Sequence, residues 1–60
     1  MNFSDDFILL SYVNTKLRDE FDSLDDLCDS LNFDKTELLA RLKGVGFVYN
    51  ESDNKFIGVI

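Results

Sequence analysis

The sequence has 60 residues, with 12 acidic side chains, 6 basic side chains and no histidine, for a formal net charge of −6. A chain of this length forms one domain, residues 1–60, and its hydrophobic fraction of 45% predicts a folded core rather than intrinsic disorder. A single cysteine excludes an internal disulfide, the lack of histidine excludes an ordinary zinc site, and no apolar run reaches the roughly 18 residues that span a bilayer.

The first predicted element is an amphipathic helix in SDDFILLSYVNTKLRDEF, residues 4–21. Ser4, Asp5 or Asp6 can cap its start, where a carboxylate also favours the positive end of the helix dipole. Apolar residues then recur at helical spacings of three and four. The stripe consists of Leu10, Val13, Leu17 and Phe21, and is widened by Leu9 and Tyr12.

Two shorter helices follow. Ser23 precedes Asp26 by three residues, a near relative of the capping box, and predicts the start of the second helix. Its apolar face is Leu24, Leu27, Cys28 and Leu31. The third helix has a better capping box from Asp34 to Glu37. Its apolar residues are Leu38, Leu39 and Leu42, and Phe33 can pack on Leu38 as a hydrophobic staple.

Gly44 or Gly46 can end the third helix in a left-handed conformation. Residues 46–60 then read as a β-hairpin, because aromatic and β-branched runs flank a polar loop of turn-forming residues. The loop is longer than two residues, so the strand register stays open. The predicted fold is α+β and mostly α: three helices, of which the second and third form a helix-turn-helix-like pair, followed by a C-terminal β-hairpin in a winged-helix-like arrangement.

Catalysis is not expected from this composition. Without histidine, acid–base chemistry requires carboxylates or lysines perturbed in a concave site, for which a chain of this size leaves little room. Cys28 lies on the apolar face of the second helix, where a free thiol behaves as a small hydrophobic core residue. We therefore expect no enzyme, no cofactor and no small-molecule ligand.

Residues 19–29 contain six acidic side chains and no basic one. Calcium loops place ligands at alternate positions around a glycine, and this run has neither feature. Helix caps and a solvated face account for the run most simply. The sharper alternative is an acidic surface that docks a basic partner or mimics DNA phosphates. Its residues would be Asp22, Asp25, Asp26 and Asp29.

Asn14 and Arg18 lie one helical turn apart at the border of the apolar stripe. Half-buried polar groups must find hydrogen-bond partners, so a structural role is favoured over ligand binding. We expect Asn14 to satisfy backbone groups in the turn before Ser23, and Arg18 to pair with a nearby carboxylate.

The pattern resembles the small bacterial proteins of the family called domain of unknown function 4250, from about Asp6 to Phe56. The residues that carry the resemblance are Leu9-Leu10-Ser11, Val13-Asn14, Lys16-Leu17-Arg18-Asp19, Ser23-Leu24-Asp25, Leu27-Cys28, Glu37-Leu38, Arg41-Leu42, Gly46-Phe47-Val48-Tyr49 and Asn54-Lys55-Phe56. The stretch at residues 13–19 is the most distinctive. Phe7 stands where family members often carry proline, and residues 57–60 run past the usual end. The resemblance implies a bacterial or phage source, an intracellular domain and no assigned activity.

In a helix-turn-helix protein, the second helix of the pair enters the major groove and a hairpin can flank it as a wing. The residues that could face DNA here are Lys35, Thr36, Arg41, Lys43 and Lys55. Three features oppose this function: the preceding helix carries aspartates, the turn lacks glycine, and the candidate reading helix is rich in leucine. The net charge also repels phosphates, so nucleic-acid binding is the alternative rather than the leading hypothesis.

The leading hypothesis is a non-enzymatic protein–protein interaction module that uses helix-turn-helix-like architecture. A two-stranded hairpin is marginal alone and exposes strand edges, so pairing with a partner or in a homodimer would cover them. The expected partner surface is Phe56, Ile57, Val59 and Ile60. A third hypothesis is an acidic inhibitor that occupies nucleic-acid-binding grooves. An acidic N-terminus and a single free thiol predict a cytoplasmic location, with no membrane association.

Overall fold

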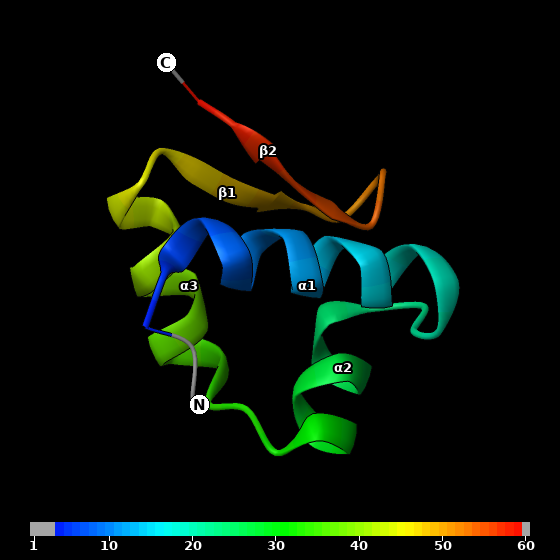
Figure 1. The fold of residues 1–60 in the computed structure, drawn as a ribbon. Coiled ribbons are helices and arrows are strands. Elements are labelled where there is room, and N and C mark those ends of the chain that lie inside the picture. Colours follow the sequence, from blue (N-terminus) through cyan, green and yellow to red (C-terminus); the bar gives the residue numbers. More distant parts are fainter. Residues whose placement is uncertain (1–3, 60) are drawn as a thin grey trace.

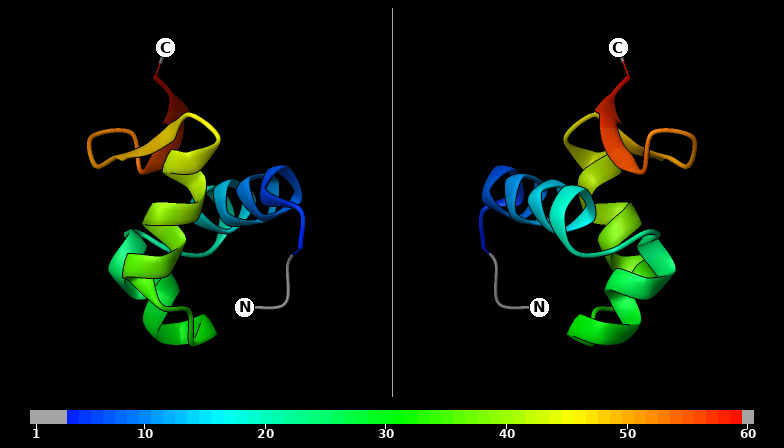
Figure 2. Two further views of the ribbon diagram at one scale, coloured as in Figure 1. Left: turned by 90° about the vertical axis from the view of Figure 1, so that its left-hand side faces the viewer. Right: turned by 90° about the vertical axis from the view of Figure 1, so that its right-hand side faces the viewer.

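In the computed structural model, which describes residues 4–59, three helices are followed by an antiparallel β-hairpin (Figure 1). The elements are α1 (Asp6–Asp19), α2 (Leu24–Leu31), α3 (Lys35–Gly44), β1 (Phe47–Asn50) and β2 (Lys55–Gly58). The α+β, mostly helical fold predicted from the sequence is confirmed. α1 runs across α3 and the helices lie on one side of the hairpin, as the side views also show (Figure 2). None of the helices in residues 4–59 is long and apolar enough to cross a membrane.

α1 begins after Asp5, whose carboxylate accepts hydrogen bonds from the backbone N–H groups of Phe7 (2.8 Å) and Ile8 (3.3 Å). The fully packed face of this helix differs from the predicted stripe. Its buried residues are Leu9, Val13 and Leu17, whereas Leu10 and Tyr12 are partly buried. Because the helix ends at Asp19, Phe21 lies beyond it and packs on the core from the following turn.

The two predicted capping signals act as expected. The Ser23 hydroxyl accepts a hydrogen bond from the N–H of Asp26 (3.1 Å), and the Asp34 carboxylate accepts one from the N–H of Glu37 (3.1 Å). Each bond satisfies a donor that has no partner within its own helix. Gly46, with a φ of 90°, takes the left-handed conformation after α3, whereas Gly44 is the last residue of the helix.

The hairpin has a defined register, with Val48 opposite Ile57 and Tyr49 opposite Phe56. The inner face of the hairpin carries Phe47, Tyr49 and Phe56, and the Tyr49 and Phe56 ring centroids are 5.5 Å apart. Side chains alternate between the faces of a strand, so Val48 and Ile57 lie on the outer face.

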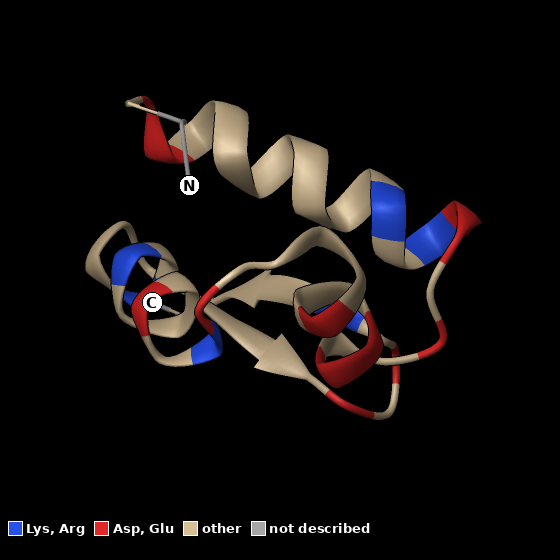
Figure 3. Cartoon of the chain, turned by 90° about the horizontal axis from the view of Figure 1, so that it is seen from below, with Lys and Arg blue, Asp and Glu red and all other residues tan. Residues whose placement is uncertain are grey.

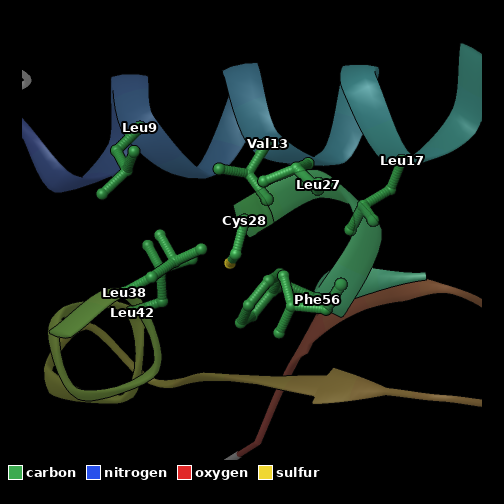
Figure 4. Close-up of a cluster of buried hydrophobic side chains, with 9 residues drawn as sticks. Leu9, Val13, Leu17, Leu27, Cys28, Leu38, Leu42 and Phe56 are labelled. Atoms are coloured by element: carbon green, nitrogen blue, oxygen red, sulfur yellow. The ribbon is translucent and has the colours of Figure 1, made fainter. Parts of the chain in front are cut away.

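The hydrophobic core lies between the three helices and the inner face of the hairpin (Figure 4). Its buried residues are Leu9, Val13, Leu17, Leu24, Leu27, Cys28, Leu38, Leu42 and Phe56. Phe56 is the hairpin's contribution to this group, so β2 closes the core rather than extending away from it.

Candidate functional site

Two of the cations expected to face DNA are engaged within the chain. The Lys35 ammonium lies 2.7 Å from a carboxylate oxygen of Asp25, and this hydrogen bond raises the pKa of Lys35. The Arg41 guanidinium lies 2.6 Å from a carboxylate oxygen of Asp6, and the Arg41 side chain is only 23% exposed. Two of the three positive charges on α3 are therefore already offset by an acidic neighbour.

The other three candidate DNA-facing residues are exposed but spread over the molecule. Thr36 lies in the first turn of α3, Lys43 near the end of that helix, and Lys55 at the start of β2. Lys43 and Lys55 form no ion pair with another residue of the described part of the chain. Two separated lysines give a weak positive footprint compared with the concentrated basic surface of most DNA-binding domains.

The turn between α2 and α3 does not need the glycine that the sequence lacks. Asn32 adopts the left-handed conformation there, with a φ of 58°. The N–H groups of Asn32 and Phe33 both donate to the carbonyl of Cys28, the second at 2.9 Å. Asparagine tolerates this conformation better than most residues. The missing glycine therefore does not argue against helix-turn-helix geometry.

The four aspartates proposed as an acidic surface are all exposed. Figure 3 shows the acidic segments on α2 and in the turns beside it. Asp25 is held by Lys35, whereas Asp22, Asp26 and Asp29 form no ion pair within residues 4–59. In the same part of the chain, no group of three or more acidic or cysteine side chains is placed to hold a metal ion.

Cys28 is a core residue, as its place on the apolar face predicted. Its side chain is 5% exposed and contacts the hydrophobic cluster rather than a cleft. Burial raises the pKa of the Cys28 thiol, which lowers its thiolate fraction at neutral pH. The buried, protonated thiol is therefore a poor nucleophile.

Asn14 satisfies backbone groups, as expected, but not in the turn before Ser23. Its Nδ2 donates to the carbonyl oxygen of Phe56 (3.1 Å), and its Oδ1 accepts from the N–H of Phe56 (2.8 Å). The side-chain amide of Asn14 thus forms hydrogen bonds with β2 in the way that the backbone of a neighbouring strand would. Arg18 pairs with the Asp19 carboxylate (2.8 Å) as predicted, which lowers the pKa of Asp19.

Asn54, to which the sequence pointed only through the family resemblance, fixes the hairpin loop to α1. It adopts a left-handed conformation, with a φ of 52°, and its Nδ2 donates to the carbonyls of Leu17 (3.1 Å) and Phe21 (2.9 Å). Its Oδ1 accepts from the Tyr49 hydroxyl. Asn54 is therefore the residue that supplies a hydrogen bond to the backbone in the turn before Ser23. The sequence signals were an asparagine at the end of a hairpin loop and its place in the family-like stretch Asn54-Lys55-Phe56.

The expected partner surface is only partly present. Phe56 is 3% exposed, so its assignment to a partner surface was wrong: its ring completes the chain's own core. Ile57 is half-buried and Val59 is 49% exposed, whereas Ile60 lies outside the described residues. Val48 pairs with Ile57 across the strands, so the apolar outer face also includes Val48, which the expected partner surface left out.

An open groove of about 1010 Å³ lies beside α1, where this helix meets the hairpin loop. Phe7, which is 59% exposed, lies at one part of its wall, and Arg18, Asp53 and Lys55 line others. The wall carries both signs of charge, and its Arg18 is already paired with Asp19. The groove therefore selects no ligand class by charge.

A family model described as domain of unknown function (DUF4250) matches residues 4–56. The chain belongs to this family. The match spans all three helices, β1 and the start of β2, so the DUF4250 region includes both asparagines that dock the hairpin. No curated protein and no solved structure matches the chain.

Proposed function

We propose that this DUF4250 chain is a non-enzymatic protein-interaction module. The observation that carries the proposal is the outer face of the hairpin, where Val48, Ile57 and Val59 present apolar side chains away from the core. β-Branched residues stabilise a strand by packing on a neighbouring surface, and none of these three side chains packs against the hydrophobic cluster that residues 4–59 form. A partner protein would supply that surface.

The ion pairs of α3 favour a protein partner over DNA. Binding phosphate through Lys35 or Arg41 would require breaking a contact with Asp25 or Asp6. The net charge of −6 adds long-range repulsion from any nucleic acid. The helix pair then serves as a scaffold that presents the hairpin, in place of a DNA reader.

Site-specific photo-crosslinking in the chain's native cell tests the proposal. A photoreactive amino acid is placed at Ile57, on the outer face of the hairpin, and in a matched chain at Thr36, on the helix that would read DNA. We expect a protein crosslink from position 57 and none to nucleic acid from position 36. Crosslinks to DNA from position 36, with none to protein from position 57, would overturn the proposal in favour of a transcriptional regulator.

A third probe at Asp29 tests the acidic alternative. Asp29 is exposed on α2 and lies outside the hairpin. A basic nucleic-acid-binding protein crosslinked from position 29 but not from position 57 would replace the proposed module with an acidic inhibitor.

A further inference from the structure

The hairpin has one edge that the chain covers and one that it leaves open. The backbone groups of Phe56 bond to Asn14 rather than to Tyr49 across the hairpin. In an antiparallel ladder, opposite residues alternate between pairs that exchange hydrogen bonds and pairs that do not. Tyr49 therefore directs its N–H and C=O away from β2, and Phe47, two residues earlier, does the same. The bond from the N–H of Val59 to the carbonyl of Gly46 (2.8 Å) fits this alternation.

Nothing in residues 4–59 pairs with these outward groups of β1. Figure 3 shows β1 on the side of the hairpin away from α1, whereas β2 lies beside that helix. Natural edge strands are usually protected by charged residues, proline or bulges. β1 reads Phe47-Val48-Tyr49-Asn50 and has no charged residue and no proline. It is thus an uncharged edge strand whose outward donors and acceptors have no partner within residues 4–59.

We propose that β1 pairs antiparallel with β1 of a second copy of this chain, with Val48 opposite Val48 on the two-fold axis. This inference rests on the proposed interaction function and names its partner. The two hairpins would form one four-stranded sheet, which is more stable than an isolated hairpin. With Val48 on the axis, Phe47 of each copy lies opposite Tyr49 of the other. All outward backbone groups of both residues are then satisfied.

The same register joins the apolar outer faces of the two hairpins. Ile57 and Val48 of one copy continue directly into Val48 and Ile57 of the second, so β-branched side chains form a row across the new sheet. An unrelated peptide could use the open edge, but only a second copy supplies this self-complementary row.

Charge also agrees with an antiparallel self-pairing. β1 begins just after α3, which carries the exposed Lys43 in its last turn, and ends at a loop that carries Glu51 and Asp53. Antiparallel pairing brings the acidic loop of each copy toward the lysine-bearing end of the other. A parallel pairing would instead bring the two acidic loops together.

Charge exchange at the two-fold axis tests the proposal. Sedimentation of the wild-type chain from micromolar to millimolar concentration should show a monomer–dimer equilibrium. The variants Val48→Lys and Val48→Glu each place like charges face to face and should raise the dimer dissociation constant about tenfold or more. An equal mixture of the two should restore a heterodimer, because residue 48 meets only itself. Far-UV circular dichroism of each variant establishes that it is folded.

Thr36→Lys and Thr36→Glu are the matched controls, because Thr36 is exposed in the first turn of α3, at the end of that helix farther from β1 (Figure 1). These two variants should dimerise like the wild type. A wild-type chain that stays monomeric at millimolar concentration, or a mixture of Val48 variants that stays monomeric, overturns the self-pairing. If position 57 then crosslinks to a different protein in cells, the interaction function stands without the dimer. If position 57 crosslinks to no protein, both proposals fail.

Discussion

Replacing Asn14 with alanine removes both hydrogen bonds that fasten β2 to α1. Phe56 is 3% exposed, so its N–H and C=O would lose their partners in a site that water reaches poorly. Each unsatisfied buried backbone group costs about 1–3 kcal/mol, which gives a loss of about 2–6 kcal/mol for the pair. A domain of this size has a free energy of unfolding of only ~3–5 kcal/mol from its core. We therefore expect Asn14→Ala to lie close to its unfolding midpoint at room temperature.

Urea denaturation followed by far-UV circular dichroism measures this loss, and hydrogen exchange of the Phe56 amide reports the local bond. Thr15→Ala is the matched control, because Thr15 is the next residue on α1 and is exposed. It should change the free energy of unfolding by less than about 0.5 kcal/mol. An Asn14→Ala variant as stable as Thr15→Ala would refute the role of Asn14 as a substitute strand.

Four further outcomes follow from local contacts. Asn54→Ala should lower the free energy of unfolding, measured in urea, by about 1–3 kcal/mol. The carbonyls of Leu17 and Phe21 and the hydroxyl of Tyr49 would lose their hydrogen-bond partner. Arg41→Ala should cost about 1 kcal/mol in the same assay, whereas Lys43→Ala should cost nothing measurable, since only Arg41 is held in a half-buried ion pair. Asn32→Ala should cost about 1 kcal/mol and Asn32→Gly much less, because only glycine accepts a φ of 58° without strain. Burial raises the pKa of Cys28 in the folded chain, so ionisation of this thiol favours unfolding once the pH rises above the pKa of the thiol in the unfolded chain. Cys28→Ala should therefore lose less stability at alkaline pH, and an unchanged slope of the free energy of unfolding against pH would contradict this reasoning.

The elements that the sequence predicted well are those set by near neighbours. Ser23 and Asp34 bond to N–H groups three residues ahead, so their capping role is written in the local pattern. Asn14 was recognised as a structural residue, but its partner Phe56 is 42 residues away. Sequence periodicity cannot predict a contact between residues so far apart, because the contact depends on how the hairpin docks on α1.

Prediction of the candidate site was limited in the same way, by contacts between residues far apart in the sequence. Lys35 and Arg41 look free in the sequence, and only the packing of the helices brings Asp25 and Asp6 to them. The misplacement of Phe56 was avoidable, since side chains alternate along a strand and Phe56 must face away from Ile57. Placing Phe56 on one apolar surface with Ile57, Val59 and Ile60 ignored that alternation.

The pairing of Asn14 with Phe56 has a consequence for a chain still being synthesised. All three helices are synthesised before β2, so the leucines that face the core remain uncovered until Phe56 has been added. Truncation before residue 56 would leave those leucines open to proteases and chaperones. Folding also has to bring residues 14 and 56 together across most of the chain, which slows it relative to a bundle built from neighbouring helices. Closure of the core therefore depends on a single strand that is made after all three helices.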